Sequence, residues 1–303
     1  MSWRSRGLGS WGGALVAAIL LLAWPLSAPA SGKTSARSSS QASAKTRTST
    51  PDVRSAAVLV LDRSDGSVIF ARKAETAAPI ASITKLMTAL VVLEGKQPLD
   101  EVVEITAEDR RGAQGSASRL AVGTKLSRAD LMHLALMSSE NRAAHALGRS
   151  YPGGERAFVR AMNVKAKALG MKNSKFADPT GLSSANVSSP RDLAKLVMAA
   201  SRNPIIREYS TSPSHEVRIG RTAVQYRNTN SLVQNPAWSI AVQKTGYISE
   251  AGQCLVMQAE IEGRPVIMVL LNSWGKYTRV ADAKRIRQWM ESRGTRSLAR
   301  AGR

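Results

Sequence analysis

Segments typical of β-strands stand at the two ends of this chain, far apart in the sequence. Four runs rich in apolar and β-branched residues are separated pairwise by short turns, and they span residues 56–62, 67–73, 253–261 and 265–271. The first turn carries Asp65-Gly66, a dipeptide favoured in hairpins, and the second carries Gly263. Because hairpins need a shared sheet to bury their apolar faces, the residues between them, about 95–235, are predicted to be an insertion.

The insertion and its flanks carry helical patterns. Apolar side chains recur at helical spacing in two flanking segments, residues 79–94 and 277–291. Ser127 with Asp130, and Ser189 with Asp192, are capping signatures at the starts of two further helices. These patterns predict an α/β fold of the α+β kind: an antiparallel sheet flanked by terminal helices, with an inserted all-helical lobe. We expect the functional site between the sheet and the lobe.

The first 30 residues have the features of an export signal. Arg4 and Arg6 precede an apolar run at residues 14–24, and Ala28-Pro29-Ala30 supplies small residues for a signal peptidase. The apolar run is short for a membrane span, which needs about 20 residues. We therefore predict a signal peptide over residues 1–30 and a periplasmic location.

The segments on either side of the predicted domain lack large apolar side chains. Residues 31–54 are mostly Ser, Thr, Ala, Lys and Arg, which predicts a disordered basic linker. Residues 292–303 form a similar basic tail, without the stripe of an amphipathic membrane-anchoring helix. The folded domain is thus expected at residues 55–291, as a monomer with at most peripheral membrane association.

The chain is strongly basic, with a formal net charge of +21, of which +19 remains without Arg4 and Arg6. Such a charge raises nucleic-acid binding as an alternative. Aromatic residues make up only 5%, however, and no nucleic-acid-binding module is recognisable, so no nucleic-acid partner is expected. For an exported protein, attraction to an anionic cell envelope or simple solubilisation explains the charge equally well.

Ser82 and Lys85 lie three residues apart in the apolar segment 79–94. Residues at this spacing are neighbours on a helix surface, so the lysine amine can reach the serine hydroxyl. A serine hydroxyl becomes a nucleophile when a neighbouring base takes its proton, and a lysine is such a base when burial or nearby charge lowers its pKa. The pattern alone is weak, because a helix-capping serine followed by a solvated lysine looks the same.

Two further short motifs follow in chain order. Ser139-Glu140-Asn141 falls between two predicted helices, where a turn rich in Ser and Asn is the ordinary interpretation. Lys244-Thr245-Gly246 falls in a predicted edge strand, where the glycine is either an ordinary kink or a place for close backbone approach. Together with Ser82 and Lys85, these motifs make up the set found in penicillin-binding proteins and class A β-lactamases.

Longer segments extend this resemblance, and they span residues 137–144, 168–171, 178–182 and 243–248. With them, the chain from about Ser55 to Glu291 resembles the low-molecular-mass penicillin-binding proteins, which are D-alanyl-D-alanine peptidases. Within that family it is most similar to the penicillin-binding protein 7 type, a D-alanyl-D-alanine endopeptidase. The resemblance implies a β-lactamase-like fold and a serine peptidase that acts on peptidoglycan.

The resemblance also implies a role for each motif residue. Ser82 forms the acyl-enzyme, Lys85 is its base, and Ser139 relays the proton to the leaving nitrogen. Substrate binding falls to Asn141, Lys244, Thr245 and Gly246. The backbone N–H groups of Ser82 and Tyr247 form the oxyanion hole.

The partners implied are peptidoglycan stem peptides and crosslinks, with β-lactam antibiotics as covalent inhibitors. No cofactor or metal is expected, because His133, His145 and His215 are scattered along the sequence. The motifs leave endopeptidase and carboxypeptidase activity both open, since both cleave after D-alanine. A class A-like β-lactamase is disfavoured because the loop at residues 178–189 lacks a glutamate to activate water. An inactive envelope-binding scaffold is disfavoured because every motif is intact.

Overall fold

The structure, a computed structural model, describes residues 50–113 and 115–301, with side chains described up to residue 293. The predicted signal peptide and most of the predicted linker lie outside the described residues. No helix in the described part of the chain is long and apolar enough to cross a membrane.

The last residues of the predicted linker pack against the domain. Val53 is buried, and the backbone N–H of Arg54 donates to the Asp282 carboxylate at 3.1 Å. The ordered packing therefore begins slightly before Ser55, the predicted start of the domain.

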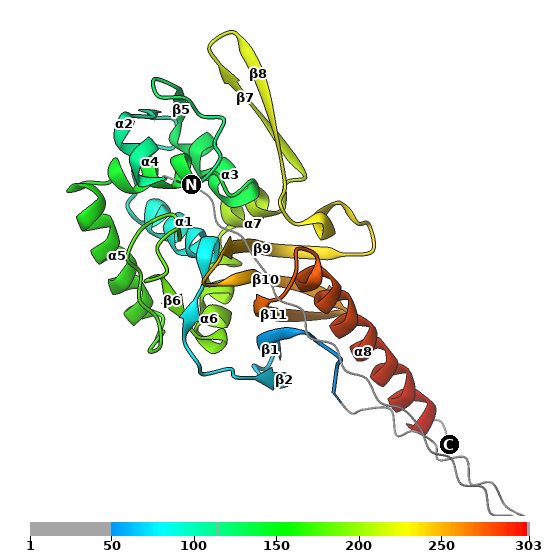
Figure 1. Cartoon of the computed structure of the whole chain (residues 1–303). Helices are drawn as coiled ribbons and strands as arrows, with labels where there is room; N and C mark the ends of the chain where they lie inside the picture. The colour runs from blue at the N-terminus through cyan, green and yellow to red at the C-terminus, as the bar shows by residue number, and fades with distance from the viewer. Residues whose placement is uncertain (1–49, 114, 302–303) are drawn as a thin grey trace, which may run out of the picture. The chain divides into compact units, whose positions relative to one another are not determined.

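A five-stranded antiparallel sheet with the order β2-β1-β11-β10-β9 lies at the centre of the domain (Figure 1). Its strands are β1 (Ser55–Asp62), β2 (Val68–Arg72), β9 (Ser239–Ile248), β10 (Gly252–Ile261) and β11 (Arg264–Ser273). The N-terminal and C-terminal parts of the domain meet where β1 pairs with β11, with Leu59 opposite Val269. The prediction of two hairpins in one sheet is confirmed.

Both faces of the sheet are buried, because the side chains of each strand alternate between two apolar clusters. Val58 and Val60 of β1 belong to one cluster, together with Ile286 of the C-terminal helix α8 (Thr278–Ala301). Leu59 belongs to the cluster on the opposite face, where the other helices lie. Burial on both faces explains why these strands are nearly continuous apolar runs.

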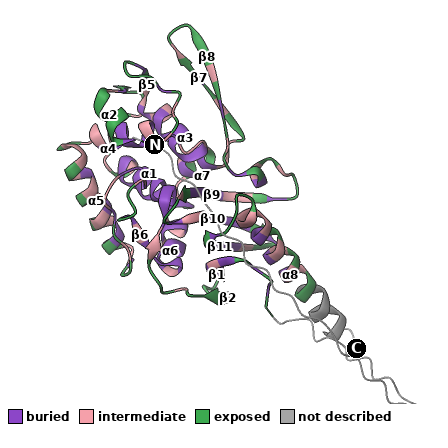
Figure 2. Cartoon of the chain, viewed as in Figure 1, coloured by how far each residue is buried: buried purple, intermediate pink, exposed green. Residues whose placement is uncertain are grey.

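The remaining helices lie on the second face of the sheet and in the inserted lobe. They are α1 (Thr84–Glu94), α2 (Ala107–Gly112), α3 (Arg128–Met137), α4 (Asn141–Arg149), α5 (Gly154–Ala168), α6 (Pro190–Ala200) and α7 (Pro204–Thr211). Figure 2 shows α1 almost wholly buried, since α3, α4, α5 and α6 all pack against it. Helix α8 continues beyond its predicted end at Glu291.

The helix starts test the capping predictions. The Ser127 Oγ accepts the N–H of Asp130 at 3.0 Å and the Ser189 Oγ accepts the N–H of Asp192 at 3.2 Å, so both caps are confirmed. The segment at residues 79–94 becomes α-helical only at Thr84. A short strand, β3 (Ala78–Pro79), and a 3₁₀ turn, η1 (Ala81–Ile83), come first.

The structure adds short strands to a lobe that the sequence predicts to be all-helical. They are β4 (Val102–Glu104), β5 (Lys125–Ser127), β6 (Val187–Ser188), β7 (Ser214–Ile219) and β8 (Thr222–Arg227), and a 3₁₀ turn, η2 (Ser231–Gln234), follows. The β7–β8 hairpin stands out from the lobe and is largely exposed (Figures 1 and 2). Only Val217 and Tyr226 of this hairpin are buried, so its apolar pattern is weak.

Candidate active site

Ser82 and Lys85 lie where η1 passes into α1. The Lys85 Nζ is 2.7 Å from the Ser82 Oγ, the contact that their spacing predicts. Ser82 is 8% exposed and Lys85 only 1%. Ser82 thus keeps a small exposed surface, whereas Lys85 is enclosed by protein.

The Lys85 amine contacts only uncharged oxygen atoms. Besides the Ser82 hydroxyl, it donates to the Asn141 Oδ1 and the Thr180 carbonyl oxygen, each at 2.7 Å. Burial lowers the pKa of Lys85 to about 7, against the opposing effect of the Asp178 and Glu140 charges. A large share of the amine is therefore neutral near pH 7, which is the state a general base needs.

The Thr180 carbonyl is positioned by a loop to which the sequence assigned no site residue. The Asp178 Oδ1 accepts the N–H and the hydroxyl of Thr180, each at 2.6 Å, and the N–H of Gly181 at 2.7 Å. Gly181 has a φ of +81°, and a Cβ there would lie 2.0 Å from the Ala81 carbonyl oxygen. Only glycine permits the loop to approach the Ser82 turn this closely.

The Ser139-Glu140-Asn141 motif joins α3 to α4. Ser139 has a φ of +63°, a conformation that costs energy in a residue other than glycine and is often found at functional sites. Its Oγ accepts a hydrogen bond from the Lys244 Nζ at 2.9 Å. Glu140 caps α4 by accepting the N–H of Arg142 at 3.1 Å. The turn thus directs Ser139 toward β9 while Asn141 contacts Lys85.

The Lys244-Thr245-Gly246 motif lies on β9, which is an edge strand of the sheet. Lys244 is fully buried, and its Nζ also donates to the Thr245 carbonyl at 2.9 Å. Burial, followed by the charges of Lys85 and Arg279, lowers the pKa of Lys244 well below its usual range. A Cβ on Gly246 would lie 3.1 Å from the Ser82 nitrogen, so β9 passes directly against the nucleophile turn.

In the structure Lys85 contacts Ser82 and Asn141, Lys244 contacts Ser139, and Gly246 lies against the Ser82 turn with Tyr247 next to it on β9. Two more polar residues lie beside them, to which the sequence assigned no role: Thr229 and the motif residue Glu140. The Thr229 hydroxyl is 2.6 Å from the Thr245 hydroxyl. Glu140 is buried, and burial raises the pKa of its carboxyl. Thr229 lies in a polar connection between β8 and η2 without a motif, so only the fold reveals it.

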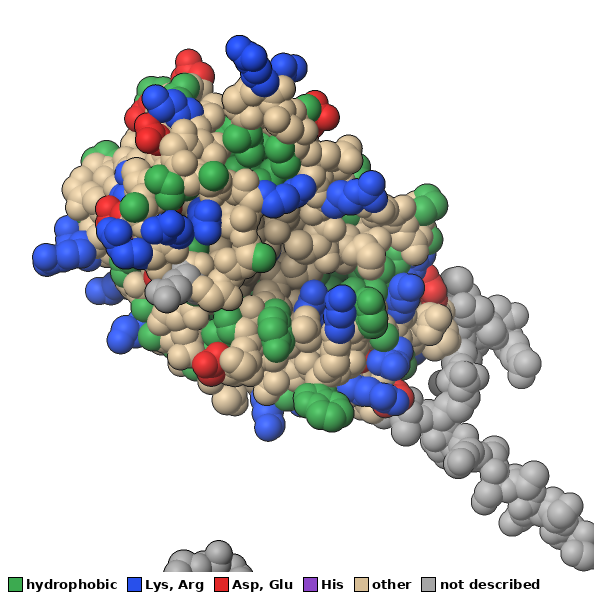
Figure 3. Space-filling view, turned by 45° about the horizontal axis from the view of Figure 1, so that its top comes forward, with side chains coloured by type: hydrophobic (Ala, Val, Ile, Leu, Met, Phe, Trp, Pro, Cys, Tyr) green, Lys and Arg blue, Asp and Glu red, His purple; other side chains and the backbone are tan. Residues whose placement is uncertain are grey.

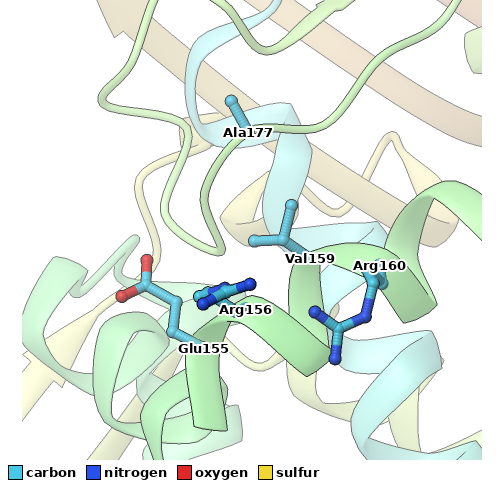
Figure 4. Close-up of a pocket in the computed structure, with 5 residues that line it drawn as sticks. All are labelled: Glu155, Arg156, Val159, Arg160 and Ala177. Carbon is cyan, nitrogen blue, oxygen red and sulfur yellow. The ribbon is translucent and has the colours of Figure 1, made fainter.

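The described residues contain no group of three His, Cys, Asp or Glu side chains arranged to hold a metal ion. A pocket of about 330 Å³ lies beside α5 (Figure 4), and it is lined by Glu155, Arg156, Val159, Arg160 and Ala177. None of the predicted site residues lines that pocket. Figure 3, which views the domain from a different direction, shows a hollow in its surface with Lys and Arg side chains around it.

A serine held 2.7 Å from a buried lysine, beside the edge strand of an antiparallel sheet, is the arrangement that serine acyl transfer requires. Sequence comparison gives the family. Residues 44–275 match the Peptidase_S11 family, described as D-alanyl-D-alanine carboxypeptidase, and the chain belongs to this family. The family resemblance inferred from the motifs is confirmed.

Two sequence relatives and one solved structure show which kinds of family member this chain resembles. The chain is 49% identical over 243 residues to a D-alanyl-D-alanine endopeptidase of Pseudomonas aeruginosa, covering 80% of this chain and 78% of that protein. It is 42% identical over 275 residues to a D-alanyl-D-alanine endopeptidase of Escherichia coli, covering 90% and 86%. The crystal structure of the Streptomyces K15 DD-transpeptidase matches with a TM-score of 0.73 at 29% identity, covering 79% of this chain and 97% of that one. The predicted fold class is confirmed.

Proposed function

We propose that this protein is a periplasmic D-alanyl-D-alanine endopeptidase that opens D-alanine-containing crosslinks in peptidoglycan through an acyl-enzyme on Ser82. The observation that carries the proposal is the buried Lys85 amine, 2.7 Å from the Ser82 hydroxyl and with a pKa of about 7. The two relatives named as endopeptidases favour this activity over that of a carboxypeptidase.

Acylation begins when the neutral Lys85 amine takes the proton of the Ser82 hydroxyl as its oxygen attacks the D-alanyl carbonyl. The backbone N–H groups of Ser82 and Tyr247 stabilise the negative charge on the carbonyl oxygen. The leaving amine then needs a proton, which the Lys85 ammonium supplies through the hydroxyl of Ser139. Water then hydrolyses the ester: Lys85 accepts a proton from the attacking water and returns it to the Ser82 oxygen as the acyl–oxygen bond breaks.

The other motif residues hold the substrate. The Asn141 Oδ1 accepts from Lys85, which leaves its amide N–H groups to donate to a peptide carbonyl. Lys244 and Thr245 bind the carboxylate beside the scissile bond, and the Thr229 hydroxyl orients that of Thr245. β-Lactams acylate the same serine, because they present a reactive amide and a carboxylate to these groups.

The periplasmic location rests on the signal-like residues 1–30, which lie outside the described residues. We infer that the mature protein works as a monomer on peptidoglycan. The basic linker and tail provide attraction to the anionic envelope, which makes any membrane association peripheral.

Digestion of purified crosslinked muropeptides tests the activity. The protein should convert dimers to monomers, and Ser82→Ala should abolish both this conversion and labelling by a fluorescent penicillin. Loss of the hydroxyl costs at most about 2 kcal/mol of folding stability, so the variant stays folded. Ser64→Ala, in the β1–β2 turn, is the matched control.

Three results would contradict the proposal in different ways. Release of free D-alanine from pentapeptides with dimers left intact would make the protein a carboxypeptidase. Sustained nitrocefin turnover in place of one stoichiometric burst would make it a β-lactamase. Acylation of Ser82→Ala would mean that another residue is the nucleophile.

A further inference from the structure

A cavity of about 610 Å³ lies next to the Ser139 turn, between the segment at residues 117–119 and strand β8. Its lining residues are Ala117, Ser118, Arg119, Ser138, Glu140, Gln225, Tyr226 and Arg227. Ser138 and Glu140 are the chain neighbours of Ser139, so the cavity adjoins the reaction centre. Its volume is within the range of ligand pockets, about 300–1,000 Å³. The mechanism proposed above assigns no role to any of these side chains.

One part of the cavity wall is anionic. Glu140 is only 6% exposed, yet it lines the cavity and forms no ion pair with another described residue. Its carboxylate accepts a hydrogen bond from the Arg142 N–H at 3.1 Å and another from the Ser118 hydroxyl. A carboxylate can accept about four hydrogen bonds, so capacity remains for a cationic ligand.

Another part of the wall is cationic. The Arg119 guanidinium lies over the Tyr226 ring, 3.8 Å from its centroid, and donates to the Gln225 carbonyl at 2.8 Å. The guanidinium has five N–H donors, so most of them remain available to a carboxylate. Arg227 lines the same cavity. Neither arginine forms an ion pair with a carboxylate in the described part of the chain.

The Tyr226 hydroxyl is a buried polar group that forms no hydrogen bond of good geometry among the described residues, although the Arg119 guanidinium lies beside it. Leaving such a group unpaired costs stability, which calls for an explanation. Burial, followed by the charge of Glu140, raises the pKa of Tyr226 to about 12, so the hydroxyl keeps its proton and is available as a donor. A ligand with an acceptor group would satisfy it.

We propose that this cavity is the subsite for the residue that precedes D-alanine in the stem peptide, a diamino acid whose side chain ends in an ammonium and a carboxylate group. Glu140 binds the ammonium, whereas Arg119 and the Tyr226 hydroxyl bind the carboxylate. This inference rests on the proposed peptidoglycan peptidase function and deepens it. The combination of a buried carboxyl group with two arginines in the wall of one cavity matches a zwitterionic group and is poorly suited to an apolar or singly charged one.

Three synthetic crosslinked peptides test the subsite. They differ only in the side-chain end of the donor diamino acid. The first peptide carries both the ammonium and the carboxylate. In the second the carboxylate is replaced by a carboxamide, and in the third the amine is acetylated. For the unaltered protein, kcat/KM for each singly charged peptide should fall about 10- to 100-fold, since a hydrogen bond to a charged group is lost. Equal values for the three peptides would overturn the proposal.

Arg119→Gln should remove the preference for carboxylate over carboxamide and keep the preference for a free ammonium. Arg119→Lys should restore part of the preference for carboxylate over carboxamide, because lysine returns the positive charge but lacks the planar set of guanidinium N–H donors. Arg221→Gln makes the same change at the tip of the β7–β8 hairpin, outside the cavity, and should keep both preferences. Rates are expressed relative to penicillin acylation, which reports on Ser82 and Lys85 without a diamino acid.

Tyr226→Phe separates ligand binding from a structural role. Removal of an unpartnered buried hydroxyl should leave the melting temperature unchanged or raise it, whereas KM for the doubly charged peptide should rise. A lowered melting temperature with unchanged KM would mean that the hydroxyl serves the fold.

The subsite can fail independently of the endopeptidase proposal. If penicillin labels Ser82 but crosslinks stay intact, the same three diamino acid variants can be placed in linear pentapeptides, and the rate of acylation by each pentapeptide can be measured. Faster acylation by the pentapeptide with both charged groups would support the subsite and reject only the endopeptidase activity. Absence of any penicillin labelling would instead reject the catalytic assignment itself.

Discussion

The helical lobe holds a set of charged side chains, the lobe cluster, which is built on two buried residues and in which each charge has an opposite charge beside it. It consists of Asp109, His145, Arg149 and Glu155. The Asp109 Oδ1 lies 2.8 Å from the His145 Nδ1 and 2.9 Å from the Arg149 Nε, and the His145 Nε2 lies 3.3 Å from Glu155. In the candidate catalytic cluster of Ser82, Lys85, Ser139, Asn141 and Lys244 the two amines are also buried, but among the described residues they contact only hydroxyl, amide and carbonyl oxygens.

The lobe cluster shifts pKa values so that the charged forms are favoured, whereas the catalytic cluster shifts them so that the neutral form is favoured. Burial opposes the charged form of His145, yet Asp109 and Glu155 together raise its pKa to about 9. Burial likewise opposes the charge of Asp109, yet His145 and Arg149 lower its pKa to about 2. In the catalytic cluster burial prevails and lowers the pKa of Lys85. Paired charges stabilise the lobe, whereas an amine without a carboxylate contact is kept ready to accept a proton.

Replacing Lys85 with Arg should have the largest effect on activity. Arginine stays protonated, so it cannot accept the Ser82 proton, and acylation by penicillin should fall about 10²- to 10⁴-fold. Stopped-flow or gel-based acylation rates measure this. Lys125→Arg, at an exposed site, is the control. Near-normal acylation in Lys85→Arg would remove the lysine from the base role.

Replacing Asp109 with Asn should have the largest effect on stability. It leaves His145 and Arg149 without their carboxylate, and breaking a buried pair costs about 3–5 kcal/mol of unfolding free energy. Urea denaturation measures the loss, and acylation per folded molecule should persist. Asp130→Asn, which breaks a partly exposed contact with His215, should cost about 0–1 kcal/mol. Equal losses of unfolding free energy in the two variants would show that the lobe cluster contributes no more to stability than an exposed ion pair.

Activity and stability should respond to pH in opposite directions. Because the Lys85 pKa is about 7, acylation should rise about 100-fold from pH 5 to pH 8 and then level off. The raised pKa of His145 contributes stability that is fully present below its ordinary pKa of 6.5 and is lost as pH rises through about 9. Acylation rates and melting temperatures at each pH test this. A parallel rise of both would contradict the assignment, and His145→Gln should flatten only the stability profile.

Replacing Lys244 with Gln should have the smallest effect of the four. A bound carboxylate opposes the effect of burial and favours the protonated form of Lys244, which then makes a charge-assisted contact. Loss of this contact should lower acylation by substrates that carry a carboxylate about 10-fold, while Thr245 still donates a neutral hydrogen bond. An uncharged thioester should lose less. Equal losses on the two substrates would mean that Lys244 holds Ser139 in place instead of binding the carboxylate.

Local chemistry made much of the protein predictable. The sheet pairing followed from continuous apolar strands at both ends, and the caps followed from Ser127 and Ser189. The reach of Lys85 to Ser82 followed from helical spacing. Where the prediction missed, the local signal was weak: the β7–β8 hairpin buries little, so its strands lack a strong apolar pattern.

The sequence by itself determined which residues are candidates for the chemistry, because the Ser82–Lys85 pair and the motifs at Ser139 and Lys244 are short and keep their identity wherever they fold. Only the tertiary structure decided how those residues behave. The Lys85 pKa depends on enclosure by α1, the Asp178 loop and α4, and Asp178 and Gly181 act only because their loop meets the Ser82 turn. Burial and electrostatic interaction depend on distances between segments remote in the chain, and no local pattern contains those distances.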